Sequence, residues 1–148
     1  MIGKISKGKS FRGCLNYLLK KEDAQLLESN LGGQNVDELN REFGAIGQTN
    51  PRVARAVFHA SLSTPAHEAP TDDQWRAIAS DYLEGMGFDD NQYLLIKHQD
   101  TSHKHVHLVT NRVKINGECV SQRFDYRRSE ELVRQLEQRY SLEPTPPS

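Results

Sequence analysis

The sequence has little cysteine and no long apolar run. Its two cysteines, Cys14 and Cys119, are far apart and have neither metal-binding nor redox spacing. We therefore expect reduced thiols and a cytoplasmic protein. No apolar stretch is long enough to span a membrane, and the sequence carries no secretory signal, so we expect no membrane insertion.

Acidic residues are missing from the first part of the chain. Residues 1–21 contain six basic residues and no acidic one, whereas residues 22–90 contain thirteen acidic and four basic residues. Residues 91–128 are basic again, with seven basic and three acidic residues. If the two basic blocks meet in the fold, they form a positive surface suited to a polyanion such as nucleic acid. The alternative is a solvated surface with chance clustering.

The size and hydrophobic spacing indicate one domain of alternating strands and helices. The chain has 148 residues, 36% of them hydrophobic and 26% charged, which is enough for a single core. Helices are predicted after four capping residues, Ser10, Asn35, Thr71 and Ser129. Strands are predicted over residues 1–7, 24–31, 53–63, 92–98, 103–113 and 118–124.

The last part of this order predicts the fold class. Residues 92–98 and 103–113 are joined by a short polar segment and are expected to form a hairpin, which requires antiparallel neighbours. We therefore predict an α+β fold, with a central, mainly antiparallel sheet and flanking helices. The domain is expected to span residues 1–143, and the proline-rich residues 144–148 are expected to begin a linker.

Histidine is concentrated in one place: four of the six histidines lie within residues 98–107. Alternate residues of a strand point to one face, so His103, His105 and His107 are expected to project together. If the hairpin pairs His98 with His103, then His98, His105 and His107 could supply three nitrogen ligands to a divalent metal and leave positions open for catalysis. The alternative is a surface histidine run with incidental metal affinity.

Tyr17 lies off the apolar stripe of the first predicted helix. It is not needed as core filling, and it belongs to the basic block that lacks acidic residues. A nearby cation or metal would favour its phenolate, which is a competent nucleophile toward phosphorus. An ordinary amphipathic surface tyrosine is the alternative.

These motifs together resemble the HUH endonucleases, and more closely the P-type relaxases of conjugative plasmid mobilisation. The core His-hydrophobic-His motif corresponds to residues 105–107, with a third ligand, His98, seven residues before it. The tyrosine on an N-terminal helix corresponds to Tyr17, and a middle strand bearing histidine and serine corresponds to residues 58–63. The resemblance implies a relaxase-like fold and a bacterial protein encoded by a plasmid or mobile element.

The resemblance also implies a reaction. Mg²⁺ or Mn²⁺ would polarise the scissile phosphate of single-stranded DNA at a transfer origin, and Tyr17 would attack it to give a 5′-phosphotyrosine and a free 3′-hydroxyl. Reverse attack would religate or transfer the strand. Imidazoles are softer ligands than Mg²⁺ usually takes. We therefore expect that Zn²⁺ or Ni²⁺ can bind at this site as well. Accessory mobilisation and coupling proteins are the expected partners.

Further site residues follow from the same interpretation. Asp100 and His103 are both candidates for the group that accepts the tyrosine proton, and Asp100 could instead orient an imidazole. Four residues are candidate DNA contacts, mainly to phosphates: Arg12, Ser61, Lys104 and Arg112.

Three other functions remain open at this point. The first is an HUH replication initiator, although those proteins generally place the tyrosine after the histidine motif. The second is a non-catalytic metal-binding or DNA-binding module of the same fold. The third is a metal hydrolase that activates water, for which Tyr17 would be dispensable.

Overall fold

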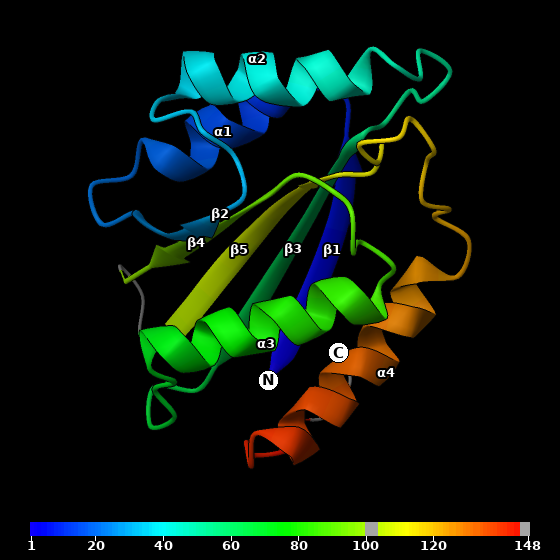
Figure 1. Ribbon diagram of the computed structural model, residues 1–148. Coiled ribbons are helices and arrows are strands. Elements are labelled where there is room, and N and C mark those ends of the chain that lie inside the picture. The colour runs from blue at the N-terminus through cyan, green and yellow to red at the C-terminus, as the bar shows by residue number, and fades with distance from the viewer. Residues whose placement is uncertain (100–103, 146–148) are drawn as a thin grey trace.

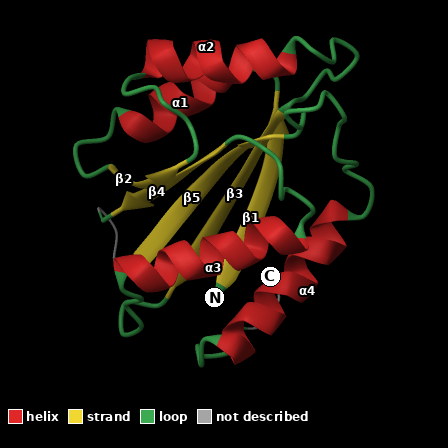
Figure 2. Cartoon of the chain, viewed as in Figure 1, coloured by secondary structure: helices red, strands yellow, loops and turns green. Residues whose placement is uncertain are grey.

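The computed structural model describes residues 1–99 and 104–145, and within them one antiparallel sheet carries two helices on each face (Figures 1 and 2). The sheet order is β1-β3-β5-β4-β2, so both edge strands come from the first part of the chain. The α+β prediction is confirmed. The elements are β1 (Ile2–Gly8), α1 (Phe11–Leu19), β2 (Gln25–Ser29), α2 (Val36–Gly47), β3 (Val57–Thr64), α3 (Asp72–Gly85), β4 (Tyr93–His98), β5 (Lys104–Asn111) and α4 (Asp125–Arg139).

Local capping explains where three of the helices begin. The side chain of Ser10 accepts a hydrogen bond from the backbone N–H of Gly13, and Thr71 forms a reciprocal capping box with Gln74. Asn35 caps α2 by accepting from the backbone N–H of Glu38. These bonds satisfy backbone donors that a helix N-terminus leaves unpaired, and they confirm three of the four predicted caps.

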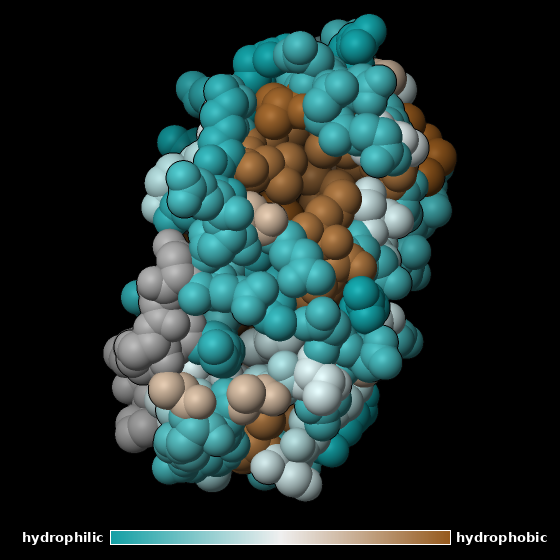
Figure 3. All heavy atoms as spheres, turned by 90° about the vertical axis from the view of Figure 1, so that its left-hand side faces the viewer, coloured by the Kyte–Doolittle hydropathy of each residue, from teal (hydrophilic) through white to brown (hydrophobic). Residues whose placement is uncertain are grey.

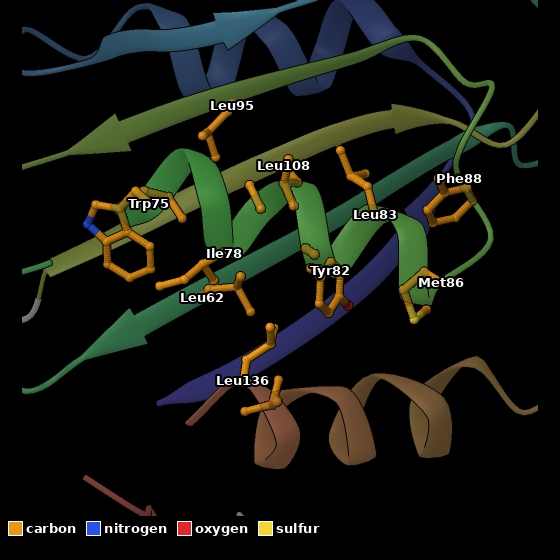
Figure 4. Packing of buried hydrophobic residues seen from close by; sticks show 14 of the residues in the cluster. Leu62, Trp75, Ile78, Tyr82, Leu83, Met86, Phe88, Leu95, Leu108 and Leu136 are labelled. Carbon is orange, nitrogen blue, oxygen red and sulfur yellow. The ribbon is translucent and has the colours of Figure 1, made fainter. Parts of the chain in front are cut away.

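The larger core lies between the sheet and the α3/α4 layer. Trp75, Ile78 and Tyr82 of α3 are fully buried and point toward the strands, as Figure 4 shows. Alternate residues of β3 and β5, such as Leu62 and Leu108, face this layer. This face therefore supplies most of the apolar burial.

A smaller core lies between the opposite face of the sheet and the α1/α2 layer. Phe11 and Phe43 stack with ring centroids 4.4 Å apart, which joins the two helices over the strands. The strands contribute Val57, Leu94, Ile96 and Val109 to this cluster. Figure 3 shows the molecule from the left-hand side of Figure 1. An apolar area is visible on this side, at the level of α1 and β2.

Two predictions near the C-terminal helix are wrong. Residues 118–124 form no strand; only an isolated bridge joins Val113 to Cys119. Ser129 is not a cap either: α4 begins earlier, after Phe124, and the Ser129 hydroxyl is hydrogen-bonded to the buried Tyr82 hydroxyl at 2.7 Å. A tertiary contact thus overrides the local capping preference of serine.

The predicted linker is described only in part. The backbone N–H of Thr145 donates to Glu137 of α4 at 2.9 Å, so this residue is held against the helix. Residues 146–148 lie outside the described residues. Across the part of the chain that the structure describes, no helix combines the length and apolarity needed to traverse a membrane.

Candidate metal centre

Three of the histidines meet at one end of the β4–β5 pair. His98 ends β4, and His105 and His107 lie two residues apart in β5. One ring nitrogen from each lies within 4.8 Å of the others. The predicted ligand set is therefore brought together on one face of the sheet.

The register differs from the expected one. His98 is paired directly with His105, and not with His103. The pairing of β5 with β3 on its other side holds β5 in this register, with His105 opposite Ser63. His103 and Asp100, the two candidate proton acceptors, lie outside the described residues.

The fully buried His98 has a defined hydrogen-bonding pattern. Its Nε2 lies 2.9 Å from the backbone carbonyl of Leu18 in α1, and because a carbonyl only accepts, Nε2 carries the proton. When the ring carries only this proton, its lone pair is on Nδ1. That atom is buried and has no hydrogen-bond partner within the described residues. It is thus available to bind a cation.

His107 shows the same arrangement with its nitrogens exchanged. Its Nδ1 lies 2.8 Å from Nε2 of His59 on the adjacent strand β3, whereas its Nε2 is buried and has no partner in the described part of the chain. Burial, followed by the charges of His59 and His98, lowers the pKa of His107 to about 3. The ring is neutral at pH 7, which is the form that binds metals.

A divalent metal fits this donor set. Two buried ring nitrogens without partners would each cost free energy unless something binds them. Together with His105 they offer three imidazole ligands, and a metal bound by three protein ligands keeps positions for substrate. His98, His105 and His107 therefore form a possible metal site.

His59 is the site residue to which sequence reasoning gave no role of its own. It was noted only as part of a strand motif. Burial, and then the charge of His98, lowers its pKa as well, so it too is neutral near the cluster. A metal-binding histidine commonly has its second nitrogen held by such a neighbour, and His59 holds His107 in that way. The sequence signals for His59 are its place in that motif and on the polar face of its strand.

Tyr17 lies on the helix that contacts the cluster. Leu18, the next residue, accepts the hydrogen bond from His98, while the Tyr17 side chain is 65% exposed, as its position off the apolar stripe predicted. The ammonium of Lys21 lies 5.0 Å from the centroid of the tyrosine ring. The charge of Lys21 also contributes to lowering the pKa of His107. Lys21 therefore lies beside the tyrosine ring and acts electrostatically on His107.

The four candidate DNA contacts are placed differently. Ser61 is half-buried and lies in register with His107, and Lys104 begins β5. Arg12 is half-exposed and paired with Asp37 at 2.5 Å. Arg112 is buried, and its guanidinium donates to the backbone carbonyls of Arg55 and Val120. Ser61, Lys104 and Arg12 are therefore at least partly accessible to a ligand. The guanidinium of Arg112 instead links two loop segments through their backbone carbonyls.

Comparison with known proteins agrees with this geometry. The family model of the relaxase MobA/VirD2-like nuclease domain matches residues 15–142. The chain belongs to this family. Protein TraI of Escherichia coli is 31% identical over 151 residues, a match that covers 93% of this chain and 20% of TraI. This relaxase domain thus spans about one fifth of that relative's length.

A solved structure supports the fold separately. It is described as the molecular basis of vancomycin resistance transfer in Staphylococcus aureus, and it aligns with a TM-score of 0.58 over 97% of this chain and 96% of its own. The two sequences are 9% identical, so this similarity concerns the fold alone.

Proposed function

We propose that this relaxase domain nicks single-stranded DNA at a plasmid transfer origin and then transfers or rejoins the strand. The observation that carries the proposal is the buried histidine cluster hydrogen-bonded, through Leu18, to the helix that bears Tyr17. A nucleophile and a metal site on adjoining elements are what a phosphoryl-transfer reaction needs.

The proposed step exchanges one phosphoester for another. The Tyr17 oxygen forms a bond to phosphorus as the bond from phosphorus to the 3′-oxygen breaks, giving a 5′-phosphotyrosine and a 3′-hydroxyl. The tyrosine proton goes to a base, for which Asp100 and His103 are the candidates, and the 3′-oxygen takes up a proton. Because the tyrosine ester retains the phosphoester linkage, the reverse attack can rejoin the strand.

The roles of the other residues follow from their positions. A Mg²⁺ or Mn²⁺ ion held by His98, His105 and His107 would polarise the scissile phosphate. Lys21, whose ammonium lies 5.0 Å from the centroid of the Tyr17 ring, would place a positive charge beside the nucleophile. Ser61, Arg12 and Lys104 are the proposed phosphate contacts, and Arg112 is not included because its guanidinium is bonded to backbone carbonyls.

The biological setting is proposed on the basis of the family alone. We propose that residues 1–143 act as the catalytic domain of a bacterial mobilisation system in the cytoplasm. Accessory mobilisation and coupling proteins would be its protein partners.

The test is formation of a covalent adduct. Single-stranded oligonucleotides tiled across the noncoding regions of the encoding replicon are incubated with the protein and Mn²⁺, separated on a denaturing gel and mapped by mass spectrometry. We expect an adduct on Tyr17 that disappears with a chelator and in Tyr17→Phe. Tyr93→Phe is the matched control, since Tyr93 lies on β4 and belongs to neither the histidine cluster nor the proposed DNA contacts, and it should retain the adduct.

Two results would contradict the proposed reaction. Metal-dependent cleavage without an adduct would indicate attack by water and make Tyr17 dispensable. Binding of metal and DNA without cleavage would indicate a binding module. Mapping the nick to a replication origin in place of a transfer origin would support a replication initiator.

A further inference from the structure

Two aromatic side chains are exposed at the start of α4. Phe124 is 61% and Tyr126 is 62% exposed, and they belong to a group of only five large hydrophobic residues that are exposed in the described part of the chain. Figure 1 shows α4 beside β1, away from the α1/α2 layer. These rings are therefore not part of either core.

The backbone of Phe124 makes its residue type unexpected. Its φ is 59°, in the left-handed region that glycine or asparagine adopts easily and a bulky aromatic rarely does. Its side chain forms no capping hydrogen bond, and the exposed ring recovers little by burial. Such a conformation at a non-glycine residue is typical of functional positions. The Phe124 ring therefore contributes little to the stability of the fold and is accessible to a ligand.

Basic side chains surround both rings. The guanidinium groups of Arg123 and Arg127 lie 5.0 Å and 5.8 Å from the centroid of Phe124, and the Lys7 ammonium lies 4.2 Å from that of Tyr126. Both rings line a hollow of about 590 Å³, and the cations that line it with them are Lys7, Arg55 and Arg127.

The charge of this hollow is mainly positive. The acidic residue that lines it, Asp125, is already paired with Lys7 at 2.8 Å. Among the described residues, no ion pair is formed by Arg55, Arg123 or Arg127. Three guanidinium groups therefore remain available to an anionic ligand.

Lys7 is in register with Phe58 and so lies on the α3/α4 face of the sheet, whereas the histidines lie on the other face. A DNA strand that reaches both must therefore pass around the edge of the sheet that β1 forms. Tyr126 also lines a second hollow together with Lys4 of β1. Lys4 is in register with Ser61, which is in register with His107, so the three side chains share one face of the sheet. Two strand spacings separate Lys4 from His107, roughly 10 Å. A single strand of nucleic acid can cover that distance.

We propose that Phe124 and Tyr126 form a stacking platform for unpaired bases of a DNA strand, with Arg55, Arg123 and Arg127 contacting its phosphates. Exposed aromatic rings interleaved with cations are the combination by which proteins hold single strands without reading their sequence. The inference rests on the proposed function, since it assigns the strand that leads to the histidines a second binding site on this domain.

The experiment uses a new tryptophan as a reporter. Trp75 is the chain's one tryptophan and is fully buried, so Phe124→Trp introduces an exposed indole whose fluorescence reports stacking. The reporter is combined with Tyr17→Phe and a chelator, so that binding is measured without any reaction. We expect an oligothymidylate of about 16 nucleotides to quench this fluorescence, and quenching to weaken with added salt.

Matched variants test the two components of the platform. Phe124→Ala and Tyr126→Ala should each weaken oligothymidylate binding by about tenfold, measured by fluorescence anisotropy of a labelled strand. Ile115→Ala, which removes an exposed apolar side chain that lines neither hollow, should leave binding unchanged. Arg123→Gln with Arg127→Gln should reduce the salt dependence, and Arg41→Gln on α2 should not.

Phe124→Gly separates binding from folding. Glycine accepts the positive φ, so this variant should lose binding while its melting temperature stays equal or rises. A clear fall in melting temperature would show a structural role and overturn the inference. Quenching by duplex DNA of the same length as strong as by the single strand would also overturn it.

The two proposals can fail separately. Adduct formation on Tyr17 with no quenching of the reporter would overturn the platform alone. Quenching and weakened binding in the variants, without any adduct, would support the platform and contradict the proposed nicking reaction.

Discussion

The two faces of the sheet perform different tasks with the same strands. In β5, Val106 and Leu108 face the α3/α4 layer and its large core, whereas His105 and His107 face the opposite side. The period of two along a strand keeps these sets apart although they alternate in sequence. A substitution should therefore affect either stability or chemistry, depending on the parity of its position.

The difference between the two faces also explains how the protein can keep a buried histidine cluster that lowers the stability of the fold. Buried imidazole nitrogens without partners lower stability when no metal is bound. The α3/α4 face contains the larger share of buried apolar residues, among them Trp75 and Tyr82. Its packing offsets the cost of a polar site on the other face.

The largest effect is expected for removing a ligand. His105→Ala should reduce metal-dependent DNA cleavage about a thousandfold, the equivalent of about 4 kcal/mol of transition-state stabilisation. Single-turnover cleavage measures this effect, and the metal-free melting temperature should stay close to that of the parent. A large fall in that temperature would mean that the two faces are not separate.

The converse substitution tests the other face. Leu108→Ala should lower the free energy of unfolding by about 3 kcal/mol, since it removes a buried side chain from the large core. Urea unfolding measures the loss. Cleavage per folded molecule should remain unchanged at low temperature; a comparable loss of cleavage would contradict the division of tasks.

The reactivity of Cys14 measures how closely the α1/α2 layer covers its core. Burial raises the pKa of the Cys14 thiol from 9.0 to about 11, so the thiolate fraction below pH 9 should be about a hundredfold lower than in the unfolded chain. Because the thiolate is the reactive form, alkylation should be slow and rise about tenfold per pH unit up to about pH 11. Mass spectrometry after iodoacetamide labelling separates Cys14 from Cys119. Rapid labelling at neutral pH would show that this layer opens readily.

The smallest effect is expected for His59. His59→Ala should weaken metal binding about thirtyfold, because His107 loses the partner that fixes its ring. Competition titration with a chromophoric chelator measures the affinity. His59→Gln should recover part of it through its amide, and Ser63→Ala, on the same face of β3, should have no effect. Equal losses in the Ala and Gln variants would exclude a hydrogen-bonding role.

Local patterns in the sequence were sufficient for most of the fold. The alternation in residues 53–63, the caps at Ser10 and Thr71 and the apolar stripes of the first three helices depend on neighbours close in the chain. The spacing of His98, His105 and His107 likewise predicted the ligand set that the structure brings together.

The remaining features depend on contacts between distant segments. Residues 118–124 have strand-like composition, but in the described part of the chain they pair with neither edge strand of the sheet, and only an isolated bridge joins Cys119 to Val113. The role of His59 requires β3 to lie beside β5, which no local pattern specifies. Ser129 looked like a cap because nothing in its neighbourhood indicated that Tyr82 needs its hydroxyl.

The strand order also determines when the histidine cluster can exist during synthesis. β1 pairs with β3, and β3 pairs with β5, so neighbouring strands are separated by long intervening segments. Such non-local pairing makes folding slow. The cluster can be assembled only once β5 has emerged from the ribosome and closed the centre of the sheet. A nascent chain shorter than that holds Tyr17 without the histidine cluster, so under the proposed function it would be unable to cut DNA.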